Sequence, residues 1–260
     1  MKATRKLIPA FAMLLIAAVM MSTATFAWFS TNTSVTAGGM SIQAKSETIF
    51  LQIVNANTAF NDDLDQINAD AVVANTTVAP VHPAKSLATD LKTIEKYTDA
   101  DTAIDFTKIV WVTAFSNKVD SSAKPAGSLY TDISSTIESN VLKNTFSVRL
   151  NPSKGGKVVS GENLTINNVE FDQINGTEDK SLLSAVRILV AGPDGVAIFD
   201  ESGTLIAGTA ILASTLKADG TPVELTVYVY FDGEDTDCHS NNVEFDEKYT
   251  VTFKLDITAA

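Results

Sequence analysis

The chain has 260 residues, 45% of them hydrophobic, and a formal net charge of −12 at pH 7. This length and apolar content suit a folded protein with a substantial core and do not fit a disordered chain. The excess of acidic residues excludes ordinary binding to nucleic acid or to anionic membrane surfaces, because both partners are negatively charged.

The first 27 residues have the three parts of a secretory signal. A basic start with Lys2, Arg5 and Lys6 precedes an apolar run from Leu7 to Met21, and Thr25-Phe-Ala27 supplies small residues for a signal peptidase. The apolar run is shorter than the roughly 20 residues of a membrane span. We therefore predict a signal helix over residues 1–27, and an uncleaved anchor is the alternative.

Cleavage between Ala27 and Trp28 would leave a secreted protein that contacts the membrane only before it is cut. The signal contains three bases and no acid, so the product would keep 16 bases against 31 acids, a net charge of about −15. Such a charge favours solubility.

Residues 28–39 form an uncharged, Ser/Thr-rich segment that we expect to be extended. Side chains alternate between the two sides of a strand. One side would carry Phe29, Thr31, Thr33, Val35 and Ala37, and the other Trp28, Ser30, Asn32, Ser34 and Thr36. The segment is polar enough to stay soluble and β-prone enough to add to an exposed sheet edge, so Trp28–Ala37 is a candidate donor strand with Gly38 and Gly39 as its hinge.

Residues 40–260 read as one domain of short β-strands separated by polar turns. A bulge is expected at Asn167–Asn168, where the alternation changes phase, and a hairpin is expected around Gly192-Pro-Asp-Gly195. The expected strands are Met40–Ala44, Thr48–Val54, Ile109–Phe115, Thr145–Leu150, Leu164–Phe171, Ala185–Ala191, Val196–Phe199, Val223–Phe231 and Tyr249–Ile257.

Two segments show helical rather than strand spacing. Ala84–Tyr97 carries apolar residues at a four-residue or three-residue step after a proline, and Thr131–Leu142 carries them at a four-residue step. Both predict short amphipathic helices inserted between strands, whereas Asn55–Ala79 predicts a polar insertion. The fold class is therefore all-β, with a β-sandwich as the expected architecture.

Two stretches carry a resemblance to known proteins. Thr23-Ala-Thr-Phe-Ala-Trp-Phe-Ser30, followed by Val35-Thr-Ala-Gly-Gly-Met-Ser-Ile42, resembles the N-terminus of the TasA/camelysin group, which are biofilm-matrix and cell-surface proteins of Gram-positive bacteria. Val227-Tyr-Val-Tyr-Phe-Asp-Gly-Glu-Asp-Thr-Asp-Cys238 is similar to a motif of exported clostridial and related proteins with this type of signal.

The resemblance implies a jelly-roll sandwich, a dedicated signal peptidase as the processing partner, and self-assembly into extracellular fibres. In TasA-like fibres the N-terminal segment completes the sheet of the neighbouring subunit, which implies the same role for Trp28–Ala37. The alternative function is a monomeric cell-surface adhesin or ligand-binding sandwich, in which this segment pairs with its own sheet.

Four carboxylates crowd one turn, at Asp232, Glu234, Asp235 and Asp237. Several oxygens on a flexible loop suit Ca²⁺, although the spacing does not match the twelve-residue helix-flanked calcium loop. The simpler alternative is a solvated acidic turn whose Asp side chains cap backbone groups. A calcium ion at this turn is the one cofactor that the sequence suggests.

Catalytic patterns are absent from the sequence, so we expect no enzyme. His82 and His239 are the two histidines and form no local zinc motif, and there is no G-x-S-x-G nucleophile turn. Cys238 is the single cysteine; we interpret it as a small buried apolar residue, with a disulfide between copies as the alternative.

Overall fold

A computed structural model of the chain describes residues 36–44, 51–64, 69–71, 79–87, 94–113, 130–151, 162–175, 182–217, 219–238 and 248–259. The chain divides into two compact units, residues 1–33 and 34–260, and every described residue belongs to the second. The predicted signal helix and the cleavage site at Ala27–Trp28 lie outside the described residues. Within the described ranges, no helix is long and apolar enough to cross a membrane.

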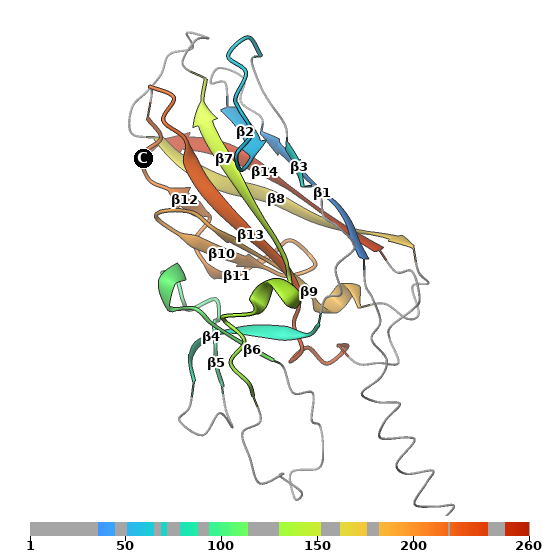
Figure 1. Cartoon of the computed structure of the whole chain (residues 1–260). Coiled ribbons are helices and arrows are strands. Elements are labelled where there is room, and N and C mark those ends of the chain that lie inside the picture. Colours follow the sequence, from blue (N-terminus) through green and yellow to red (C-terminus); the bar gives the residue numbers. More distant parts are fainter. Residues whose placement is uncertain are drawn as a thin grey trace, which may run out of the picture. The chain divides into compact units, whose positions relative to one another are not determined.

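The second unit contains three β-sheets (Figure 1). Sheet A has the order β12 (Ile211–Ala213), β8 (Glu162–Asn175), β14 (Lys248–Ala259), β1 (Thr36–Ala44) and β3 (Ala69–Ala71). Sheet B has the order β11 (Leu205–Gly208), β10 (Val196–Phe199), β9 (Val186–Ala191), β13 (Val223–Phe231), β7 (Leu142–Leu150) and β2 (Leu51–Asn55). Sheet C has the order β5 (Ile94–Lys96), β4 (Val81–Leu87) and β6 (Val110–Thr113).

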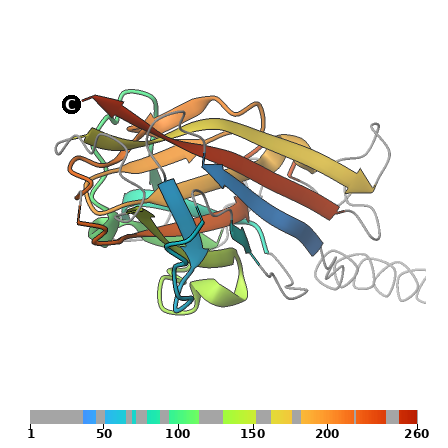
Figure 2. The same cartoon turned by 90° about the horizontal axis from the view of Figure 1, so that it is seen from above.

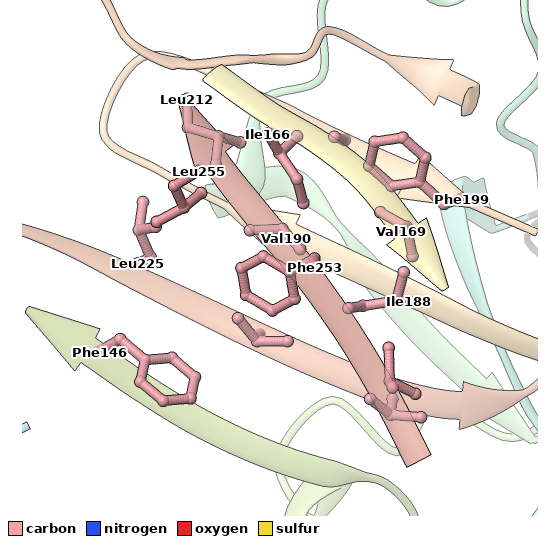
Figure 3. Packing of buried hydrophobic residues seen from close by; sticks show 14 of the residues in the cluster. Phe146, Ile166, Val169, Ile188, Val190, Phe199, Leu212, Leu225, Phe253 and Leu255 are labelled. Atoms are coloured by element: carbon pink, nitrogen blue, oxygen red, sulfur yellow. The ribbon is translucent and has the colours of Figure 1, made fainter. Parts of the chain in front are cut away.

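Sheets A and B share the main hydrophobic core, so the arrangement of these two sheets is a sandwich. On β14 the alternation places Tyr249, Val251, Phe253 and Leu255 in this core, each at most 2% exposed. Phe253 lies between side chains of both sheets, among them Val190 and Leu225 (Figure 3). Burial of large apolar side chains on facing sheets is the main stabilising term of such a fold.

Sheet C packs on the opposite face of sheet B through a second hydrophobic cluster. Trp111 of β6 contacts the rings of Tyr228 and Tyr230 on β13, with ring centroids 5.3 and 5.2 Å apart. Because sheet B is covered on both faces, every residue of β9 is buried. This double burial explains why the sequence of β9 is a nearly continuous apolar run rather than an alternating one.

Each predicted strand is confirmed over most of the residues that the structure describes, but Ile109 precedes β6 and Ala185 belongs to η3. The hairpin is confirmed as β9 and β10, which pair in antiparallel register from Val196–Ala191 to Phe199–Ile188. The bulge at Asn167–Asn168 is also confirmed: the register of β8 with β14 shifts there, and Asn168 has a φ of 49°. An asparagine tolerates this left-handed backbone better than most residues do.

The two predicted helices are wrong. The described ends of Ala84–Tyr97 are strand, with Ala84–Leu87 in β4 and Ile94–Lys96 in β5. In Thr131–Leu142 the helical part is a single 3₁₀ turn, η2 (Ile137–Ser139), and Leu142 already starts β7. Two further 3₁₀ turns occur at η1 (Phe106–Lys108) and η3 (Leu183–Ala185), and the described ranges contain no α-helix.

Candidate functional site: the N-terminal strand and the acidic turn

The first described strand, β1, begins inside the candidate donor segment. It starts at Thr36, four residues before the predicted start at Met40, and pairs with β14 in parallel register. Among the paired strands that the structure describes, this is the one parallel pair. The predicted donor residues Trp28, Phe29, Thr31, Thr33 and Val35 lie outside the described residues, whereas Ala37 belongs to β1.

The described parts of three strands of sheet A end at the same place. Thr36 of β1 is opposite Lys248, the first described residue of β14, and Lys248 is also opposite Asn175, the last described residue of β8. These ends lie side by side in Figure 2. The described part of β1 therefore begins at this end of sheet A.

Gly38 and Gly39 lie within β1, at a shift in its register to β14. Ala37 is opposite Tyr249, and Met40 is opposite Val251. Two residues lie between Ala37 and Met40 on β1, whereas only one residue lies between Tyr249 and Val251 on β14. Tyr249 and Val251 are both on the core face of β14. The glycine pair is therefore a β-bulge that keeps positions 37 and 40 on one face of the sheet.

The acidic turn follows β13 and is tied to sheet C by Asp232. His82 of β4 lies 2.9 Å through Nδ1 from Asp232 Oδ1, and both side chains are largely buried. Burial alone would raise the pKa of Asp232, but the hydrogen bond and charge of His82 hold it below the ordinary value. His82 therefore links two sheets from within a strand.

The next two carboxylates of the turn also have partners on other elements. Glu234 accepts a 2.6 Å hydrogen bond from the Tyr130 hydroxyl. Asp235 accepts a 2.7 Å hydrogen bond from Arg187 on β9, whose guanidinium also contacts Glu201 at 2.9 Å. Side chains of this turn therefore contact β4 of sheet C, Tyr130, and β9 of sheet B. The turn acts as a structural junction between these parts of the chain.

Cys238 closes the turn and is 6% exposed. Its backbone N–H donates to the Asp235 carbonyl oxygen. Burial, with the negative charges of Asp232 and Asp235, raises the pKa of the Cys238 thiol to about 12. The interpretation of Cys238 as a buried apolar residue is confirmed.

The four predicted calcium ligands do not converge on a common point among the described residues. Asp232, Glu234 and Asp235 turn to different protein donors, and Asp237 is exposed. In the described part of the chain, no group of three or more His, Cys, Asp or Glu residues is arranged to hold a metal ion. A calcium ion at the turn stays a prediction.

The partners of the acidic turn were missed by the sequence reasoning. His82 and Asp232 are 150 residues apart, and Tyr130 and Glu234 are 104 residues apart. No local pattern marks pairs at such separation, because they depend on how the sheets pack. Comparison with protein-family models, curated proteins and solved structures finds no match to this chain.

Proposed function

We propose that the protein is a secreted structural subunit that assembles into extracellular fibres or a biofilm matrix by donating Trp28–Val35 to a second copy. The role is structural rather than enzymatic. The setting is the cell surface or matrix of a Gram-positive-type bacterium, and a dedicated signal peptidase releases the donor by cutting between Ala27 and Trp28.

The observation that carries the proposal is that the candidate donor segment leads directly into β1, a strand of sheet A. Residues 28–35, which precede the described part of this strand, are uncharged and rich in β-branched and aromatic residues, so an exposed strand edge of another copy is a suitable partner.

The bulge at Gly38–Gly39 supports the same idea. It aligns position 37 with the core face, so the alternation set by Phe29, Thr31, Thr33 and Val35 continues in phase with Met40 and Ile42. A donor strand with one apolar side is what an incomplete sandwich needs. We further propose that the two-sheet arrangement is of jelly-roll type, as the resemblance implies.

The experiment compares filament formation by Trp28–Ala260 and Thr36–Ala260 in electron micrographs. The shorter chain keeps all of β1 and the core, so a loss of filaments would come from the donor and not from misfolding. We expect filaments with the longer chain and none with the shorter one.

A matched pair of variants tests which face of the donor is buried. Phe29→Asp with Val35→Asp places charge on the face aligned with the core and should abolish filaments. Ser30→Asp with Ser34→Asp adds the same charge to the opposite face and should leave them.

Two outcomes count against donation. Filaments from Thr36–Ala260 would show that the segment is dispensable. A Trp28–Ala260 monomer that does not associate at any concentration, with a protected N-terminus, would favour the monomeric adhesin instead.

A further inference from the structure

We propose that the outer edge of β8 from Glu170 to Asn175 is the surface that accepts Trp28–Val35 of a second copy, while Thr36 and Ala37 stay paired with β14 of their own chain. This inference rests on the proposed function and adds the location of the acceptor.

The outer edge of β8 is covered in its first half. The short strand β12 pairs with Leu164 and Thr165, and Ile166 N–H donates to the Ala210 carbonyl oxygen. The turn at Gly203 then lies so close to β8 that a Cβ there would come within 2.2 Å of the Val169 carbonyl oxygen. Beyond Val169, no strand in the described ranges pairs with this side of β8.

The second half of β8 offers both backbone groups and an apolar surface. In an antiparallel pair, alternate residues direct their backbone N–H and C=O away from the partner strand, so this half of β8 presents such groups on the side opposite β14. The Phe171 side chain is half-buried and packs against the main core, whereas Glu170 and Asp172 are exposed. An added strand would therefore gain hydrogen bonds and cover the half-exposed Phe171.

The edges of sheet B are occupied by other parts of the chain. At β2, the Gln52 amide donates to the carbonyl oxygens of Asn61 and Leu64, which holds a loop over that edge. At β11, Gly208 N–H donates to the Asp101 carbonyl oxygen at 2.6 Å.

Another stretch of sheet A without a described strand beside it is Thr36–Gly39 of β1, because β3 pairs only with Met40–Ile42. The outer sides of the terminal strands β12 and β3 are further edges, but each of these strands is only three residues long. The stretch Thr36–Gly39 is shorter than Glu170–Asn175 and is interrupted by the glycine bulge. A bulge disturbs the regular spacing of backbone groups that a new strand requires. The β8 edge is therefore the better acceptor.

The donor and the β8 edge are complementary in charge and pattern. Trp28–Val35 contains no charged residue, so it avoids repulsion by Glu170 and Asp172 in a chain that is strongly acidic overall. Its polar side offers hydroxyl and amide donors next to these carboxylates, and its other side carries Phe29 and Val35 toward Phe171. Because donor and acceptor are different surfaces, the contact is head-to-tail, and it produces an open filament when the rotation between copies does not close a ring.

Disulfide trapping between two variants tests the location of the acceptor. One chain carries Ser30→Cys, Asn32→Cys or Ser34→Cys, and the other carries Asp172→Cys, all as Trp28–Ala260 with Cys238→Ala. Neighbouring strands bring paired Cβ atoms close enough for a disulfide. The matched control is Lys254→Cys, on the same outer face of sheet A but on β14, which is paired on both sides.

We expect a cross-linked dimer with Asp172→Cys and none with Lys254→Cys, while reduced mixtures still form filaments. Hydrogen exchange at the outward N–H groups of Glu170–Asn175 should also slow on assembly, which reports the edge without any substitution. Filaments without a cross-link at Asp172, or with equal cross-linking at Lys254, would overturn the β8 assignment alone. Absence of filaments from the unmodified Trp28–Ala260 chain would overturn the proposed function as well.

Discussion

At the scale of single residues, the buried contact of His82 with Asp232 fastens sheet C to the end of β13. Replacing Asp232 by Ala leaves His82 buried without its partner, so we expect the free energy of unfolding to fall by about 1–3 kcal/mol. Denaturant unfolding measures the change. Asp237→Ala is the control, because this exposed residue of the same turn should change stability by no more than about 0.5 kcal/mol.

The same contact predicts how stability depends on pH. The folded-state pKa of Asp232 is lowered, so its contribution is fully present above the unfolded-state pKa of about 4 and is lost as the pH falls through the lower folded-state value. The stability difference between the wild type and Asp232→Ala should therefore shrink as the pH is lowered below about 4. A difference that does not change with acidification would contradict this role.

Cys238 should react slowly with thiol reagents in the native state. It is buried, and its thiol pKa of about 12 leaves almost no thiolate at neutral pH. We expect the colour reaction with a disulfide reagent to proceed at once in guanidinium chloride and at a far lower rate without it. A disulfide-linked dimer on a non-reducing gel of the native secreted product would contradict this expectation.

At the scale of elements, the glycine pair in β1 decides which face the donor presents. Deleting Gly38 alone removes the bulge but leaves positions 37 and 40 two residues apart, on one face of a regular strand. Deleting both glycines makes these positions adjacent, which turns the apolar side of the donor to the opposite face. Filament yield should survive the single deletion and vanish with the double one. Equal yields would favour a flexible hinge instead.

The elements that sequence could predict are those whose pattern is local. The Gly192–Gly195 turn, the phase change at Asn167–Asn168 and the alternation of β14 each contain their own signal. The segment Ala84–Tyr97 does not, because Leu87 and Ile94 suit a helix by spacing, yet they pair with each other across β4 and β5, while the start of β4 pairs with the distant β6. Tertiary pairing overrides such weak local preference.

The candidate site likewise has features that the sequence indicates and features that only the packing of the chain determines. The resemblance and the alternation point to Trp28–Ala37 as a donor, but neither indicates which edge would receive it. The half of β8 that no described strand covers is set by how far β12 and the Gly203 turn reach along it. Likewise the partners of Asp232, Glu234 and Asp235 come from sheets and segments that sequence spacing does not relate.

At the scale of the whole molecule, charge should control the rate of assembly. Copies with a net charge near −15 repel one another, and the screening length falls from about 30 Å at 0.01 M salt to about 8 Å at 0.15 M. Filament growth, measured by light scattering of Trp28–Ala260, should therefore be faster in 0.15 M NaCl than in 0.01 M NaCl. A rate that is independent of salt would show that another step limits growth.

A comparison of calcium with sodium distinguishes general screening of the protein's charge from binding of a specific ion at the acidic turn. At equal ionic strength, NaCl and CaCl₂ should give similar melting temperatures if Asp232, Glu234 and Asp235 are satisfied by protein donors, as their contacts indicate. A bound ion would instead raise the melting temperature with calcium concentration, by mass action on the folded state. Asp237→Ala then discriminates further: it leaves the three protein contacts in place, so a calcium-dependent shift that it abolishes would assign the ion to this turn.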